Sequence, residues 1–164
     1  HSYDMKRLGM HLSNDYYTNS KKYEKTIIDE IEKGNFMPCS NKDIEKYALN
    51  HEFGHLVENY LINEYNISNP NKFNAYKSKL SKATSEYEFR KIFKEYENNI
   101  CDKVAQDIYD IALKNNKDFD LNSNLSNYGK TSSQEFFVEC FSNMTSGKPN
   151  ELGKAMKEYL KGVM

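Results

Sequence analysis

The segment His51-Glu52-Phe53-Gly54-His55 restricts this chain more than any other part of its sequence. In an α-helix, residues four apart share a face and lie about 6 Å apart along the axis, so both imidazoles can reach one metal ion. Glu52 follows the first histidine and can lie beside a water molecule held by that ion. The spacing therefore predicts a helix with two metal ligands, His51 and His55, and a carboxylate between them.

This spacing is the H-E-x-x-H pattern of zinc metalloproteases, in which zinc lowers the pKa of water to about 7 and the glutamate takes its proton. Gly54 has a separate implication. A glycine inside a helix costs about 1 kcal/mol relative to alanine, and a helix tolerates it more readily where something approaches the backbone closely. The alternative is a surface helix with two solvated histidines and no metal ion.

Length and composition limit the class of protein. With 164 residues, 38% of them hydrophobic and 29% charged, the chain is expected to form one domain, residues 1–164, around one core. The formal net charge of −1 argues against nucleic acid or an anionic membrane as a partner. No apolar run approaches the roughly 20 residues that span a bilayer. A protein or peptide substrate is the partner that the metal motif predicts, and the oligomeric state is not predicted.

The three cysteines, Cys39, Cys101 and Cys140, are odd in number and widely spaced. This predicts free thiols rather than a disulfide framework or a cysteine zinc site, with one disulfide and a spare thiol as the alternative. Free thiols favour the cytoplasm, or a delivered effector if a segment precedes this chain. The chain starts with His1 and shows no signal peptide, so we expect an excised domain or a processed form.

Hydrophobic periodicity predicts a mainly α-helical domain with a small β element, an α+β class. Residues 6–13 are the segment in which we expect a short strand, and residues 115–127 are polar and predicted to form a loop. Helices are predicted at residues 20–33, 40–65, 69–82, 86–114, 131–144 and 149–161, with the metal motif in the second of them.

A catalytic zinc ordinarily has three protein ligands, so a third is expected on another element. Glu135 is the candidate because Glu135 and Glu139 lie one turn apart and face the same way among aromatic residues. Half-buried like charges need cations, which zinc and its histidines supply. If Ser132 caps this helix, Glu135 could merely complete a capping box, whereas a cap at Thr131 would leave Glu135 free for the metal.

Two segments of the chain, HEFGH at 51–55 and SNYGKTSSQEFFVECFSNM at 126–144, resemble a known family. It is the family of zincin domains that includes the catalytic domain of anthrax lethal factor and related domains of toxin and prophage proteins. The resemblance covers about 25 residues and implies a zincin-like metalloprotease fold of the gluzincin type. It implies further that His51, His55 and Glu135 bind Zn²⁺ and that Glu52 is the general base.

The same resemblance implies that Tyr128, seven residues before Glu135, directs its hydroxyl at the metal site. A phenol there could stabilise the negative charge that develops on the carbonyl oxygen during peptide hydrolysis. The alternative is a structural tyrosine, one of 13 in the chain. Glu139 is expected to accept a hydrogen bond from a ligand histidine and fix its tautomer, with a solvent-facing or helix-pairing role as the alternative.

The chain departs from the family between His55 and Glu135, where it is longer than lethal factor and carries the predicted helix 86–114. Substrate specificity is therefore not transferred. The sequence predicts a zinc-dependent endopeptidase, either toxin-like or encoded by a prophage. The alternative is a zinc-binding structural module of a phage or mobile-element particle that has no catalytic activity.

Overall fold

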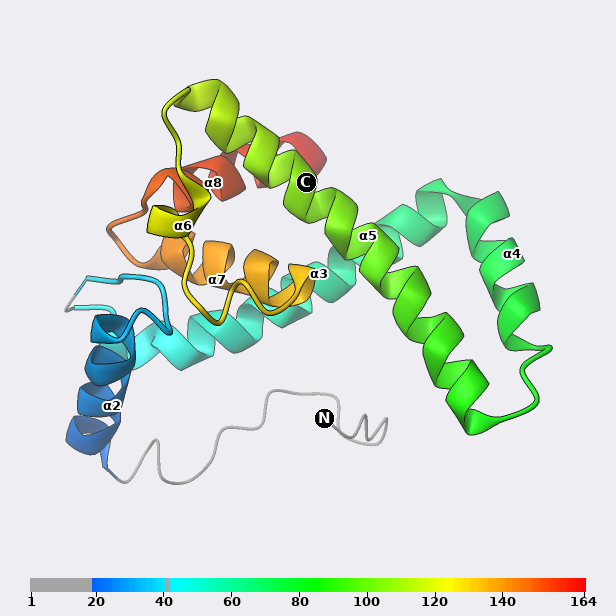
Figure 1. Ribbon diagram of the computed structural model, residues 1–164, viewed down its shortest axis with the longest axis horizontal. Coiled ribbons are helices and arrows are strands. Elements are labelled where there is room, and N and C mark those ends of the chain that lie inside the picture. The colour runs from blue at the N-terminus through cyan, green and yellow to red at the C-terminus, as the bar shows by residue number, and fades with distance from the viewer. Residues whose placement is uncertain (1–18, 41) are drawn as a thin grey trace.

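The computed structural model describes residues 19–40 and 42–164 and shows a helical protein (Figure 1). No strand occurs in this part of the chain, so the mainly α fold is confirmed, while the β element expected at residues 6–13 lies outside the described residues. The elements are, in order, α2 (Ser20–Glu32), the 3₁₀-helix η1 (Ile44–Lys46), α3 (Tyr47–Ser68), α4 (Pro70–Leu80), α5 (Glu86–Asn115), α6 (Leu121–Asn124), α7 (Ser133–Thr145) and α8 (Glu151–Val163).

The structure departs most from the predicted elements at two places. The motif helix does not begin at Ser40, because the Ser40 hydroxyl donates to the Asp43 carboxylate and the Asp43 N–H donates to the Ser40 carbonyl at 2.9 Å. These two bonds close a turn, and α3 starts only at Tyr47. The polar segment 115–127 contains the short α6, because the Asp120 carboxylate accepts hydrogen bonds from two backbone N–H groups of its first turn.

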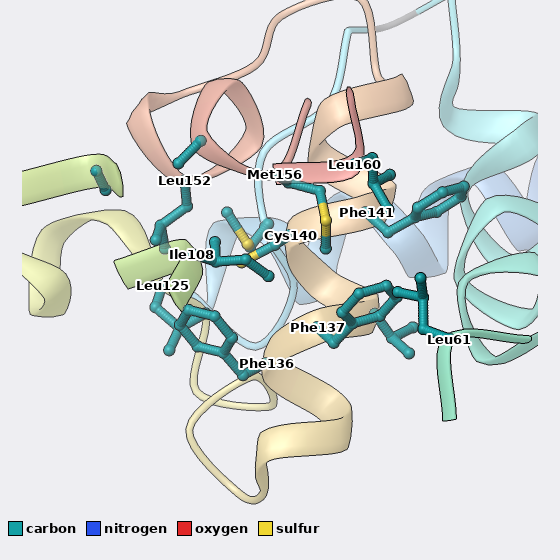
Figure 2. Close-up of a cluster of buried hydrophobic side chains, with 14 of the residues drawn as sticks. Leu61, Ile108, Leu125, Phe136, Phe137, Cys140, Phe141, Leu152, Met156 and Leu160 are labelled. Carbon is teal, nitrogen blue, oxygen red and sulfur yellow. The ribbon is translucent and has the colours of Figure 1, made fainter. Parts of the chain in front are cut away.

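Helix α7 is the centre of the core. Its residues 136–143 are all buried, because α3, α5 and α8 pack around it. Figure 2 shows side chains of α7 meeting those of the three other helices. The contacting residues include Phe136, Phe137, Cys140 and Phe141 of α7, Leu61 of α3, Ile108 of α5, and Leu152, Met156 and Leu160 of α8.

Gly54 lies where α3 and α7 pack together. A Cβ atom added to Gly54 would lie 3.2 Å from Val138 Cγ1, 3.3 Å from Val138 Cα and 3.4 Å from Phe141 Cδ1. The expectation that something approaches the backbone of α3 at this glycine is therefore confirmed, and the neighbour is the backbone of α7. This contact brings the helix that carries Glu135 against the helix that carries both histidines.

The remaining elements flank this core. Ile27 of α2 packs with Ile44 and Tyr47 beside the start of α3, and the Ala48 N–H donates to the Tyr23 hydroxyl at 3.0 Å. In Figure 1, α4 and the first half of α5 extend away from α7 and α8. All three cysteines lie in the described part and none forms a disulfide, as expected. None of the described helices is long and apolar enough to cross a membrane.

We expect Gly54→Val to lower the free energy of unfolding by about 1–3 kcal/mol, because its side chain must push α3 away from Val138. Metal binding should weaken with it, since the third candidate ligand lies on α7. Gly162→Ala is the matched control, because a Cβ at that helical glycine has no neighbour within 4 Å. Urea denaturation of both variants measures the difference, and equal stability of the two would contradict the close packing at Gly54.

Candidate metal centre

His51 and His55 of α3 and Glu135 of α7 come together, although about eighty residues separate the histidines from the glutamate. Their candidate ligand atoms all lie within 4.8 Å of one another. The Oε2 atom of Glu135 is 3.4 Å from His51 Nε2 and 4.0 Å from His55 Nε2. The three side chains that the sequence suggested as ligands therefore form a possible metal site.

The geometry of this group suits a divalent ion. In a tetrahedral site with bonds of about 2.1 Å, neighbouring ligand atoms lie about 3.4 Å apart, close to the two separations that involve Glu135. Glu135 Oε2 is buried and has no hydrogen-bond partner among the described residues. A buried carboxylate oxygen without a partner is costly, and a cation between it and the two imidazoles would supply one. Two imidazoles and a carboxylate suit zinc and several other divalent ions, so this donor set leaves the identity of the ion open.

Ser132 caps α7, and its hydroxyl accepts a hydrogen bond from the Glu135 N–H at 3.1 Å. Of the two caps that the sequence left open, Ser132 is the one observed, and Glu135 occupies the third position of the helix. The cap binds the backbone of Glu135, whereas its carboxylate points at His51 and His55. Glu135 therefore takes part in the capped first turn of α7 through its backbone and faces the histidines through its side chain.

In the metal-free protein, a proton on His51 balances part of the negative charge of the neighbouring carboxylates. Burial by itself lowers the pKa of His51, but the carboxylates of Glu135 and Glu139 together outweigh it and raise this pKa to about 9. Burial likewise raises the pKa of Glu135, yet His51, His55 and Tyr128 lower it below its usual range. A protonated His51 therefore lies between Glu135 at 3.4 Å and Glu139 at 3.2 Å, and a metal ion must displace that proton.

Glu139 is fully buried, so the solvent-facing alternative does not apply. Its Oε1 lies 3.2 Å from His51 Nδ1 and accepts the Tyr47 hydroxyl at 2.8 Å. Its Oε2 accepts the Ser126 hydroxyl at 2.7 Å and the Met37 N–H at 2.9 Å. No sequence pattern predicts the three additional donors Tyr47, Ser126 and Met37, because each comes from a different part of the chain and no regular spacing relates it to Glu139.

Tyr128 lies beside the ligand group. Its hydroxyl donates to Glu135 Oε1 at 3.1 Å, and its ring centroid is 5.6 Å from that of His51. Burial and the charge of Glu135 raise the pKa of Tyr128 to about 12, so the phenol keeps its proton at neutral pH. The backbone fixes its position, because the Tyr128 N–H donates to the Asn35 carbonyl at 3.2 Å.

Glu52 is exposed and lines a cavity of about 600 Å³ together with His51 and Tyr128. Among the described residues it forms no hydrogen bond or ion pair, so its carboxylate is available to a molecule in the cavity. The opposite wall belongs to α2 and the turn that follows it, with Ile27 and Phe36 as apolar members. Of the three candidate ligands, His51 lines this cavity beside Glu52, whereas His55 and Glu135 are not among its lining residues.

Comparison of the chain with protein-family models, curated proteins and solved structures found no match. The possible metal site therefore depends on the geometry of His51, His55 and Glu135 themselves.

We expect Glu135→Ala to weaken zinc binding more than about 100-fold, beyond what loss of a hydrogen-bonding partner of a ligand costs. Glu139→Gln should instead act first on stability, lowering the free energy of unfolding by at least about 3 kcal/mol, because four donors converge on a buried carboxylate. Chelator competition and thermal unfolding separate the two effects. Equal losses of zinc affinity would mean that Glu135 is not a ligand.

We also expect zinc affinity to rise with pH up to about 9 and then level off. Below that pH the proton on His51 competes with the ion, so affinity should change by up to about tenfold per pH unit. Titration against a pH-buffered chelator measures this slope. Calorimetry in buffers of different ionisation enthalpy should show the accompanying proton release, and an affinity independent of pH between 6.5 and 9 would exclude a protonated His51.

Proposed function

We propose that this protein is a zinc-dependent metalloendopeptidase of the gluzincin type. One observation carries the proposal: Glu135 directs a buried carboxylate oxygen that accepts no hydrogen bond at the Nε2 atoms of His51 and His55. The resemblance of the two motif segments to the lethal factor family agrees with it. We propose His51, His55 and Glu135 as the ligands, with zinc as the ion.

Zinc in this position would supply Lewis acidity, which polarises a scissile carbonyl and makes a water molecule acidic enough to attack it near neutral pH. We assign Glu52 the role of general base, which takes a proton from that water and delivers it to the leaving amine. Its free and exposed carboxylate in the cavity supports this role, because a general base must reach its proton without first breaking a hydrogen bond or ion pair.

We assign Tyr128 to the developing negative charge on the substrate carbonyl oxygen. Its raised pKa keeps the phenol protonated, and this makes the side chain a hydrogen-bond donor throughout the neutral range. In the substrate-free protein the hydroxyl donates to Glu135, so it must turn from the carboxylate to the substrate. The half-exposed ring leaves room for that movement.

Glu139 is proposed to hold His51 with its Nδ1–H toward the carboxylate, so that Nε2 faces the ion. Three other donors fix the position of Glu139, and this rigid support favours one orientation of the imidazole. A peptide chain would enter the cavity between α2 and α3, beside Glu52 and Tyr128.

The decisive variant is Glu52→Gln. Peptide hydrolysis should fall by about 10²–10⁴-fold, the contribution of a general base, while bound zinc stays at the wild-type level. Glu64→Gln is the control, because Glu64 is an exposed acid on the same helix. Turnover of a quenched peptide library and metal analysis of protein purified without a metal-affinity step provide the readouts.

Unchanged turnover in Glu52→Gln would remove this residue from the mechanism. Wild-type protein that holds zinc but cleaves no member of the library would instead support the alternative of a catalytically silent zinc-binding module.

A further inference from the structure

Glu58 is a buried carboxylate next to the second histidine. It follows His55 by one turn of α3 and is 7% exposed. Its Oε2 atom lies 3.7 Å from His55 Nδ1, and its Oε1 atom is buried without a hydrogen-bond partner. Among the salt bridges of the described residues, Glu58 pairs with His55 alone.

The other neighbours of Glu58 do not balance its charge. They are Glu97 and Cys101 of α5, the helix that crosses α3 in Figure 1. Burial and then the charge of Glu58 raise the pKa of Glu97. The same two causes, together with a hydrogen bond to Glu58, raise the pKa of the Cys101 thiol. A carboxylate buried between an acid and a thiol is costly unless a cation or a strong donor also faces it. His55 is the group in that position.

The two histidines have parallel surroundings. His51 directs Nε2 at Glu135 and Nδ1 at Glu139, at 3.4 Å and 3.2 Å. His55 directs Nε2 at Glu135 and Nδ1 at Glu58, at 4.0 Å and 3.7 Å. Each imidazole therefore lies between two carboxylates, a candidate ligand on one side and a more deeply buried acid on the other.

We propose that Glu58 is a positioning residue of the metal centre, which accepts the Nδ1–H of His55 and thereby directs Nε2 at the ion. The proposal rests on the metal site proposed above and adds a second buried acid to it. A separation of 3.7 Å is too long for a hydrogen bond in the metal-free protein. An ion on Nε2 makes the Nδ1–H a stronger donor than the thiol of Cys101, which also bonds to Glu58, so the contact shortens when the metal binds.

The test compares Glu58→Met with wild type. Methionine keeps the volume but removes both the charge and the acceptor, so zinc affinity should fall about 10–100-fold in chelator competition. The metal-free variant should be at least as stable as wild type, because a buried, poorly partnered charge is gone. A merely structural role for Glu58 predicts the opposite pattern, with lower stability and unchanged affinity.

Two further variants complete the experiment. Glu58→Gln keeps the shape and an acceptor oxygen, and should lose zinc affinity in the same direction but to a smaller extent, which preserves the test if the methionine variant fails to fold. Glu97→Gln changes a neighbour of Glu58 that does not pair with His55, and should bind zinc as wild type does.

Nuclear magnetic resonance gives a direct readout. In the zinc-loaded wild type the Nδ1–H of His55 should be protected from exchange, and this protection should disappear in Glu58→Met. Wild-type affinity and an unprotected Nδ1–H would overturn the positioning role while leaving the metal site intact. A wild-type protein that binds no zinc would overturn the proposed function instead, so the two failures are distinguishable.

Discussion

The close packing of α3 against α7 at Gly54 is the contact on which the rest of the structure depends. With no side chain at this position, the backbone of α7 comes within 3.3 Å of the place where a Cβ would stand. Glu135 precedes Val138 by one turn, so the same contact that closes the core carries the third candidate ligand to the histidines. Glycine lowers the helix propensity of α3 at this position, but its missing side chain allows the close approach of α7 that brings Glu135 to the histidines.

The charges around the two imidazoles form a consistent pattern. Glu58, Glu135 and Glu139 contribute three carboxylates to a largely buried space, and the nearest groups that can become positive are His51 and His55. One proton on His51 leaves most of this negative charge unbalanced. A divalent ion between the Nε2 atoms and Glu135 would reduce it further and give the buried carboxylate oxygen of Glu135 a partner.

Sequence spacing was sufficient for the parts of the site that are local. Two histidines four apart, and two acids four apart on a second helix, predicted which side chains share a face. Spacing could not predict that Ser40 and Asp43 would bond to each other and delay the helix, because the same two residue types at this spacing also begin helices. Nor could it predict the donors to Glu139, since long-range contacts leave no periodic trace. Glu58 and Glu64 are both glutamates of α3, and it is the packing around the helix that buries the first and leaves the second exposed.

The long helix α5 belongs to the segment between His55 and Glu135, and this segment does not keep the two residues apart in space. Among the described residues, none that lines the cavity belongs to α5, so this helix does not form the wall that a substrate would meet. Its second half packs under α7 and α8, with Ile100, Ile108 and Ala112 buried. Glu97 and Cys101 lie against Glu58, behind His55. Helix α5 therefore supports the possible metal site on the side away from the cavity, and the side facing the cavity is left to α2, α3 and the segment that carries Tyr128.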